Sequence, residues 1–193
     1  MFKYHKTPLL DNDIALELQN AMLTQKIDDT PWIIRFQTHD YWEDELTKKY
    51  PKLIEFTVDW HQMNFAERVE TDNLRIGNVF ALAQYSKDDY LQWHLDYNHR
   101  KAIVVFLDDR TEEDGSLFEF ENKPGPTWDE WEQWKKDNPD SLYVPEEKDI
   151  VRIIPKFNTW VEMDNPDELG CWHRTSPNLS GKPRLALTIF LGD

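Results

Sequence analysis

The sequence contains little that would place it outside a cell or in a membrane. Cys171 is the single cysteine among 193 residues, so an internal disulfide is excluded and a reducing cytoplasm is a compatible location. Uninterrupted apolar stretches of about 18 residues, the length that spans a bilayer, are missing. The opening residues "MFKYHKTPLL" also lack the apolar core of a signal peptide. We therefore expect a cytoplasmic protein with no membrane partner.

Positive charge is scarce as well. The chain has 22 Lys and Arg against 37 Asp and Glu, which gives a formal net charge of −15 at pH 7. Such a surface repels nucleic-acid phosphates and anionic lipids, so we expect no nucleic-acid partner. A peptide or small-molecule substrate that is neutral or basic is compatible with this charge, although acidity also serves solubility alone.

Aromatic residues, by contrast, are abundant. They form 13% of the chain, within a hydrophobic fraction of 39%. This composition provides for a sizeable core and is too aromatic for a disordered chain. Given the length, we expect residues 1–193 to form a single domain.

The N-terminal part of this domain, residues 1–77, has the pattern of a largely helical support. The segment "DNDIALELQNAMLTQ" (residues 11–25) starts with residues that cap helices, and its apolar residues recur four positions apart. We expect further helices around residues 41–49 and after Pro51.

Residues 78–193 instead contain short β-branched or aromatic runs separated by polar, Gly or Pro breaks. The clearest runs are "NVFALAQY", "AIVVFL", "SLFEF", "VRIIP", "NTWVEM" and "RLALTIFL". Strands joined by turns rather than by regular helices indicate an antiparallel sandwich or barrel.

A Trp-rich insertion at about residues 122–149 separates two of these runs. Within it, "TWDEWEQWKK" combines a Thr cap, acidic residues in the first turn and lysines in the last, which is typical of a short helix. Trp128, Trp131 and Trp134 lie three positions apart on this helix. The helix either packs against the sandwich or forms a lid that faces the substrate.

Candidate metal ligands occur in "YLQWHLDYNHR" (residues 90–100). On a strand, His94 and Asp96 would point to the same side, because positions i and i+2 share a face. His173 precedes the last apolar run, where a sandwich can bring it back across the sheet. Two histidines and one carboxylate bind Fe(II) on one face and leave positions open for a cosubstrate and O₂.

A candidate anion-binding residue opens the last apolar run. Arg184 and Thr188 are separated by an even number of positions, so both side chains lie on one face of a strand. A guanidinium binds a carboxylate through two parallel hydrogen bonds, and a hydroxyl adds another. The pair suits a dicarboxylate cosubstrate.

In this order, the motifs resemble the prolyl-4-hydroxylase-like branch of the Fe(II)/2-oxoglutarate-dependent dioxygenases. The resemblance covers residues 78–193 and rests on "QYSKDDYLQWHLD", "RKAIVVFLDD", "DGSLFEF", "IIPKFNTWVEM" and "HRTSPNLSGKPRLALTIFL". It implies a mainly β fold, the double-stranded β-helix or jelly roll, with supporting helices. It also implies a reaction in which O₂ oxidatively decarboxylates 2-oxoglutarate to succinate and CO₂ while a C–H bond is hydroxylated. The substrate would be a prolyl residue or a small molecule.

The resemblance carries over to individual positions. The implied Fe(II) ligands are His94, Asp96 and His173. Arg184 would bind the distal carboxylate of 2-oxoglutarate, and Thr188 and Tyr85 match positions that often line its pocket.

Other positions leave alternatives open. His99 and Arg100 would either line the substrate entrance or belong to a solvated turn. Lys182 is a rival to Arg184 as the cosubstrate anchor, since the spacing from the distal histidine is longer than usual. The residues Gly115–Ser116 replace the usual Gly-Gly, and the Trp-rich insertion is foreign to the family core, which leaves the substrate open.

Two functions of other classes fit the same residues. A cupin-like metalloenzyme would use the three metal ligands without 2-oxoglutarate, but it would not require Arg184. A non-catalytic binding protein on the same scaffold would not require intact metal ligands.

Overall fold

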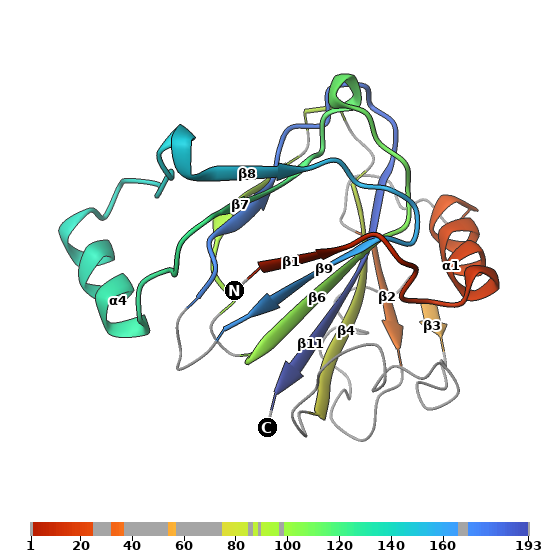
Figure 1. Cartoon of the computed structure of the whole chain (residues 1–193), viewed down its shortest axis with the longest axis horizontal. Helices are drawn as coiled ribbons and strands as arrows, with labels where there is room; N and C mark the ends of the chain where they lie inside the picture. The colour runs from red at the N-terminus through yellow and green to blue at the C-terminus, as the bar shows by residue number, and fades with distance from the viewer. Residues whose placement is uncertain are drawn as a thin grey trace.

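Two β-sheets face each other and form the body of the protein (Figure 1). This computed structural model describes residues 2–24, 32–36, 54–56, 75–84, 87–88, 90–96, 99–165 and 170–192. The strands are β1 (Phe2–His5), β2 (Trp32–Phe36), β3 (Ile54–Phe56), β4 (Arg75–Gln84), β5 (Leu91–His94), β6 (Lys101–Phe106), β7 (Phe118–Glu121), β8 (Ile150–Ile153), β9 (Trp160–Asp164), β10 (His173–Thr175) and β11 (Arg184–Gly192). The helices are α1 (Asn12–Thr24) and α4 (Trp128–Asp137), with 3-10 turns η1 (Glu112–Asp114) and η2 (Glu147–Asp149).

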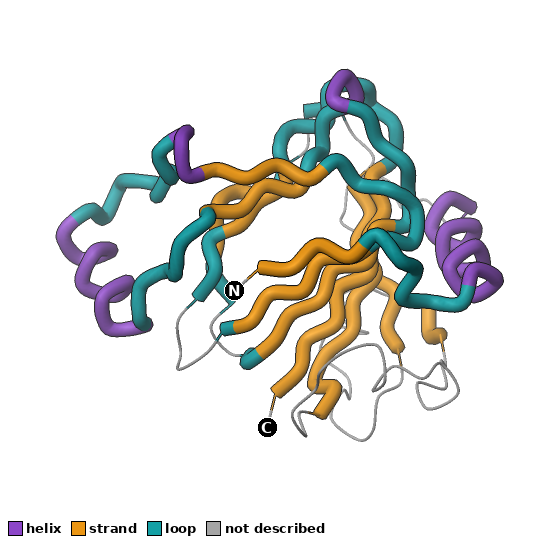
Figure 2. Tube along the Cα trace, in the orientation of Figure 1, coloured by secondary structure: helices purple, strands orange, loops and turns teal. Residues whose placement is uncertain are grey.

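The larger sheet has the strand order β1-β9-β6-β11-β4-β2-β3, and the smaller sheet has the order β5-β10-β7-β8. All paired strands run antiparallel except β2 and β3, which are parallel. In Figure 2 the two layers of strands lie over each other, with α4 beyond one end of the smaller sheet and α1 at the opposite end of the molecule. This is the mainly β jelly roll that the sequence predicts.

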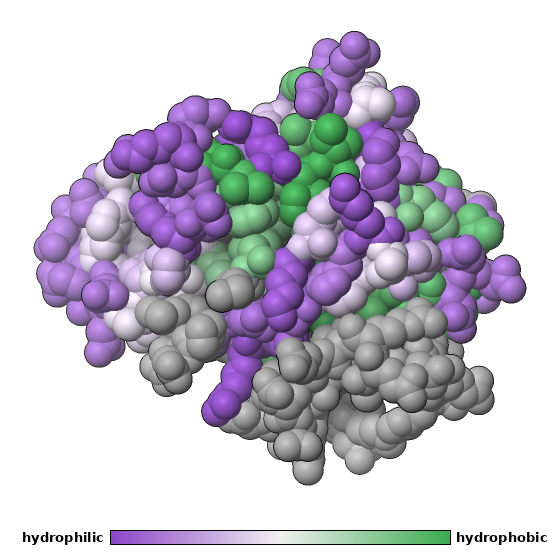
Figure 3. Space-filling model, viewed as in Figure 1, coloured by the Kyte–Doolittle hydropathy of each residue, from purple (hydrophilic) through white to green (hydrophobic). Residues whose placement is uncertain are grey.

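Alternate residues of each strand point into the space between the sheets, and these residues are mostly apolar. The cluster comprises Ala102, Val104, Phe106, Phe118, Phe120, Ile153, Val161, Met163 and Ala186. Phe2, Tyr4 and Val151 pack against it from strands β1 and β8. In Figure 3, hydrophobic side chains are visible between these two edge strands, where the core reaches the surface.

The remaining residues of β6 and β11 point to the opposite face of the larger sheet and are buried as well. Examples are Ile103, Val105, Leu187 and Ile189. Helix α1 buries Leu18 and Met22, and its Gln19 donates a hydrogen bond of 2.6 Å to the carbonyl of Leu107 just past β6. Both faces of the central strands are therefore covered, which explains their continuous β-branched runs.

Asn158 fastens the start of α1 to the sandwich. Its side-chain amide donates to the carbonyl of Leu10 at 2.8 Å and to Oδ1 of Asn12 at 2.9 Å, while its own oxygen accepts from the Leu10 amide at 3.1 Å. These bonds satisfy polar groups at a helix start that would otherwise be left in the protein interior.

The described residues of the N-terminal part include strands as well as a helix. It contains α1 as expected, but also β1, β2 and β3, which the sequence did not predict. Strand β1 is only four residues long and gains its structure by pairing with β9, from Phe2 opposite Met163 to His5 opposite Trp160. Such a short segment has too little periodicity to be recognised alone. The helices expected at residues 41–49 and after Pro51 lie outside the described residues.

The helix of the Trp-rich insertion forms where expected. Thr127 and Glu130 make a reciprocal capping box, with the Thr127 amide donating to Glu130 Oε2 at 2.8 Å and the Glu130 amide donating to Thr127 Oγ1 at 3.3 Å. Within the described part of the chain, no helix is both long and apolar enough to cross a membrane.

Candidate metal centre

The candidate ligands come together on the inner face of the smaller sheet. His94 is the last residue of β5, and His173 is the first residue of β10 and lies directly opposite it in the strand register. The two imidazole rings are 4.1 Å apart between centroids and tilted by 55°. Asp96 follows the end of β5 and places Oδ2 at 3.4 Å from His173 Nε2. One nitrogen of each histidine and a carboxylate oxygen of Asp96 all lie within 4.8 Å of one another.

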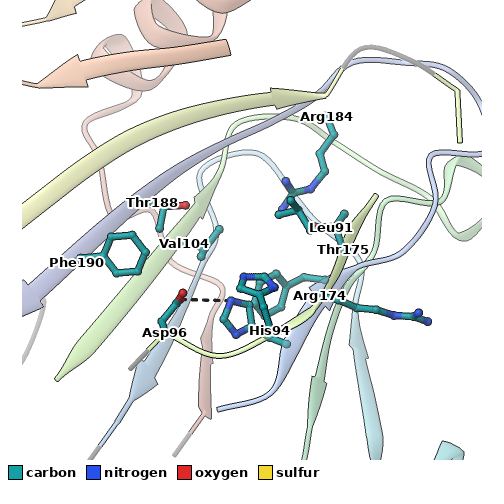
Figure 4. A pocket seen from close by; sticks show the side chains of 11 residues that line it. Leu91, His94, Asp96, Val104, Arg174, Thr175, Arg184, Thr188 and Phe190 are labelled. Atoms are coloured by element: carbon teal, nitrogen blue, oxygen red, sulfur yellow. Dashed lines mark ion pairs between the residues drawn. The ribbon is translucent and has the colours of Figure 1, made fainter. Parts of the chain in front are cut away.

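The position of Asp96 corrects one detail of the sequence prediction. The strand ends at His94, so Asp96 does not reach the shared face as position i+2 of a strand. It instead lies in the following loop, where the carboxylate still faces His173 (Figure 4).

Backbone carbonyls determine which ring nitrogen is available in each histidine. Nδ1 of His94 lies 2.7 Å from the carbonyl oxygen of Gln92, and Nδ1 of His173 lies 2.9 Å from that of Cys171. A carbonyl can only accept, so both Nδ1 atoms carry a proton, and in a neutral ring the lone pair is then on Nε2. In metal sites, a hydrogen bond from one ring nitrogen to a backbone carbonyl fixes the orientation of the histidine, and the other nitrogen faces the metal.

Burial favours the neutral imidazole of His173. The side chain is buried, and this desolvation, with a smaller contribution from His94, lowers the pKa of His173 to about 4 although Asp96 opposes the shift. At neutral pH the ring is therefore uncharged and can donate its Nε2 lone pair. Two imidazole nitrogens and one carboxylate oxygen form the donor set that suits Fe(II).

Asn165 holds the loop that carries Asp96. Its side-chain amide donates to the carbonyls of Asp96 at 2.9 Å and of His99 at 3.0 Å, and its backbone amide donates to the carbonyl of Arg100 at 2.8 Å. Sequence reasoning missed this residue, because a single Asn after a strand has the pattern of an ordinary turn.

The three candidate ligands open into a cavity of about 220 Å³ between the sheets. The cavity is lined by Leu91, His94, Asp96, Val104, Phe118, His173, Arg174, Thr175, Arg184, Thr188 and Phe190. In Figure 4, Arg184 lies at one end of the cavity and His94 and Asp96 at the other. The side chain of Arg174 runs away from the others and binds Glu119 through Nε at 2.5 Å.

Arg184 and Thr188 both line this cavity, as their even spacing on a strand predicts. Arg184 is only 2% exposed, and its burial lowers its pKa to about 10, with Asp108 opposing the shift and Arg110 adding to it. The guanidinium therefore stays charged at neutral pH. Lys182, the rival, is directed elsewhere: its Nζ lies 2.8 Å from Asp114 Oδ1, and the lysine side chain is 64% exposed.

The remaining predicted positions lie at the edge of this site or beyond it. His99 is half-buried and stacks on Phe190, a residue of the cavity wall, at 4.2 Å between ring centroids. Burial lowers the pKa of His99, and Asp96 opposes this shift. Arg100 is exposed and is not among the residues that line the cavity. Tyr85 lies outside the described residues.

The Trp-rich insertion packs away from the cavity. Trp131 stacks on Trp134 at 5.0 Å and meets the edge of Trp172 at 4.8 Å, and Tyr143 stacks on Trp172 at 4.2 Å. The described residues that line the cavity include none from the insertion. The insertion therefore packs its aromatic rings on Trp172, the residue that precedes His173.

Comparison with solved structures supports the fold. The viral collagen prolyl hydroxylase vCPH from Paramecium bursaria Chlorella virus-1, in complex with 2-oxoglutarate, matches with a TM-score of 0.58 and 13% identity over 100% of this chain and 96% of that chain. HygX from Streptomyces hygroscopicus, with nickel and 2-oxoglutarate bound, matches with a TM-score of 0.58 and 13% identity over 99% of this chain and 82% of the other. The non-heme alpha-ketoglutarate-dependent epimerase SnoN from nogalamycin biosynthesis matches with a TM-score of 0.58 and 14% identity over 100% and 78%.

No protein-family model matches this chain, and no curated protein matches it significantly in sequence. At these identities the solved structures show a shared jelly-roll fold, and the chemistry has to be argued from the site itself.

Proposed function

We propose that this protein is an Fe(II)- and 2-oxoglutarate-dependent oxygenase. The observation that carries the proposal is the pairing of two sites in one cavity: three potential metal-ligand atoms within 4.8 Å of one another, and a buried arginine at the opposite end. A metal centre alone would fit many functions, but the guanidinium of Arg184 lines the same cavity, and a guanidinium can bind a carboxylate through two parallel hydrogen bonds. Two of the solved structures with a similar fold, vCPH and HygX, contain bound 2-oxoglutarate.

The residues have distinct roles in this proposal. His94 Nε2, His173 Nε2 and an oxygen of Asp96 would hold the metal. Arg184 would bind the distal carboxylate of 2-oxoglutarate, with Thr188 as an additional hydrogen-bond donor. Bound Fe(II) would supply the redox chemistry with O₂ that couples oxidative decarboxylation of 2-oxoglutarate to hydroxylation of a C–H bond.

The rest of the cavity suits the exclusion of water from this chemistry. Leu91, Val104, Phe118 and Phe190 give it largely apolar walls. These walls would accept the hydrocarbon part of a substrate and keep bulk water away from the reacting groups.

The proposed substrate is a prolyl residue in a peptide, or else a small molecule. A prolyl substrate is supported by the prolyl hydroxylases among the structures of similar fold. The net charge of −15 favours a neutral or basic substrate and disfavours nucleic acid. We propose a cytoplasmic location, for which the single, buried cysteine is suitable.

An anaerobic titration tests the proposal. Fe(II) is added to the apoprotein, followed by 2-oxoglutarate, and the visible absorption band of a chelated 2-oxo acid is recorded. We expect the band only after both additions. It should be absent in His94→Ala and should require at least about tenfold more 2-oxoglutarate in Arg184→Ala, because a buried charge-assisted contact is lost.

Other results would favour the other classes of function. If Fe(II) binds but 2-oxoglutarate changes nothing, the site is that of a cupin-like metalloenzyme that does not use 2-oxoglutarate. If neither binds, the scaffold serves as a binding protein.

A further inference from the structure

Thr175 is a polar residue of the cavity wall to which the proposed function assigns no role. It is the last residue of β10, lines the cavity and is only 1% exposed. Its hydroxyl makes no hydrogen bond within the part of the chain that the structure describes. A hydroxyl held away from bulk water without a partner costs free energy, so it would stabilise a bound group that accepts its hydrogen bond.

The pairing of β10 with β7 shows that Thr175 and His173 point to the same side of the smaller sheet. Their partners in this register, Phe118 and Phe120, both belong to the apolar cluster between the sheets. The side chain of Arg174, which lies between them in the sequence, runs away from them (Figure 4). Thr175 therefore projects inward two positions beyond the proposed metal ligand, about 7 Å along the strand.

The two ends of the cavity can be told apart along β11. Arg184 is the first residue of this strand, and Phe190 comes near its other end. His99, in the loop that carries Asp96, stacks on Phe190 at 4.2 Å between ring centroids. The Asp96 loop therefore lies at the Phe190 end of the cavity, and Arg184 lies at the opposite end (Figure 4).

Strand β5 shows at which of these two ends Thr175 lies. Thr175 is paired with Leu91, which comes before His94 in the chain, whereas Asp96 comes after His94. Thr175 and Asp96 therefore lie on opposite sides of the paired histidines. Thr175 is thus on the side toward Arg184, as Figure 4 also shows.

This placement suits the far end of a short dicarboxylate. In 2-oxoglutarate, two methylene groups separate the keto carbon from the second carboxylate, a length comparable with two residues of a strand. A carboxylate has about four acceptor sites, of which a guanidinium uses two. A hydroxyl on the facing sheet can therefore bind the same carboxylate as Arg184.

We propose that Thr175 donates a hydrogen bond to the distal carboxylate of 2-oxoglutarate and, together with Arg184, determines the preference for a 2-oxo acid with a second carboxylate. The inference rests on the proposed function, since it adds a contact to the same cosubstrate. Arg184 holds the carboxylate from the larger sheet and Thr175 holds it from the smaller sheet. Loss of the hydroxyl therefore weakens only those ligands that carry this carboxylate.

Two 2-oxo acids of equal chain length test this contact. The affinities for 2-oxoglutarate and for 2-oxopentanoate, which lacks the second carboxylate, are measured anaerobically on the Fe(II)-loaded protein. Thr175→Val keeps the shape of the side chain and removes the hydroxyl. It should weaken binding of 2-oxoglutarate at least about tenfold, and binding of 2-oxopentanoate and of Fe(II) should stay within about twofold of wild type.

Thr175→Ser is the matched control, because it keeps the hydroxyl and loses only a methyl group. Its affinity for 2-oxoglutarate should stay within about threefold of wild type. A merely structural role of Thr175 predicts another pattern, in which both 2-oxo acids bind more weakly by the same factor or neither is affected.

Three results would overturn the inference: wild-type affinity for 2-oxoglutarate in Thr175→Val, equal weakening of both 2-oxo acids, or a Ser variant as weak as the Val variant. If 2-oxopentanoate binds too weakly to be titrated, the comparison of Val with Ser decides. If Thr175→Val does not fold, Thr175→Ala replaces it under the same expectation. Failure of the proposed function would be visible earlier, because the Fe(II)-loaded wild type itself would not bind 2-oxoglutarate.

Discussion

Among single residues, Ser116 adopts a backbone conformation that its side chain disfavours. Its φ is +52°, in the left-handed region, directly after Gly115 at φ +68°. A side chain on Gly115 would place its Cβ 2.2 Å from the carbonyl oxygen of Pro177, so only glycine fits there. Ser116 has room, but its buried hydroxyl finds no hydrogen-bond partner among the described residues. The family that the motifs resemble often has glycine at both positions, and the conformation explains why.

Ser116→Gly is therefore expected to stabilise the protein. It removes both a left-handed side-chain conformation and an unsatisfied buried hydroxyl, a gain of about 1 kcal/mol and about 2–4 °C in melting temperature. Thermal unfolding followed by circular dichroism measures this.

Asn158 provides the contrasting control for this prediction. It also has a positive φ, +58°, but its amide binds Leu10 and Asn12 at the start of α1. Asn158→Gly should therefore lower the melting temperature. A fall in Ser116→Gly as well would contradict the view that Ser116 is strained.

At the scale of whole elements, the sequence predicted the strands that carry a β-branched or aromatic run of their own, including the four-residue strands β7 and β8, and it missed β1, β2 and β3. The runs that became β6 and β11 carry enough β-branched residues to be recognised alone. Strand β10 has only three residues and exists because it pairs with both β5 and β7. Its residue His173 was nevertheless found, because its chemical identity stands out even where the strand pattern does not.

In the candidate site, too, residues with a local sequence signal were predicted and residues that depend on distant partners were missed. His94, Asp96 and His173 were recognised by residue type and spacing, and the structure brings them together. Arg110, a buried residue that adds to the lowered pKa of Arg184, was missed, because the segment "LDDR" has the pattern of an exposed turn. Its burial depends on Lys182, 72 positions further along the chain, and such distant partners leave no local signal.

Trp131 gives a prediction for the insertion as an element. Its ring packs on Trp134 and on the edge of Trp172, whereas Trp128 on the same helix is 46% exposed. Trp131→Ala should lower the free energy of unfolding by about 2 kcal/mol, less than a fully buried Trp would, because this ring is only partly buried. Trp128→Ala should change it by less than about 0.5 kcal/mol. Denaturant unfolding of the two variants measures the difference, and equal losses would show that the aromatic packing does not hold the helix.

For the molecule as a whole, metal binding should couple to global stability. The two proposed histidine ligands lie on neighbouring strands of one sheet and Asp96 lies in the loop after β5, so the three ligands come together only when this sheet is folded. At about 100 times the dissociation constant, Fe(II) or Mn(II) would add about 2.7 kcal/mol, or about 5–10 °C in melting temperature. A chelator should reverse this gain, and His94→Ala should show neither effect. An unchanged melting temperature of the wild type with saturating metal would contradict a site that forms only in the folded state.

The pairing of His94 with His173 also bears on the order in which the chain folds. The two residues face each other across neighbouring strands but are separated by 79 positions (173 − 94) in the chain. Closing a loop of this length costs about 4 kcal/mol of chain entropy, and pairings of high contact order form late. An early intermediate containing only local hairpins would offer the ion His94 and Asp96 without the third ligand. Uptake of the metal during refolding would thus report the last stage of assembly, and a kinetic trace of metal binding would lag behind the formation of secondary structure.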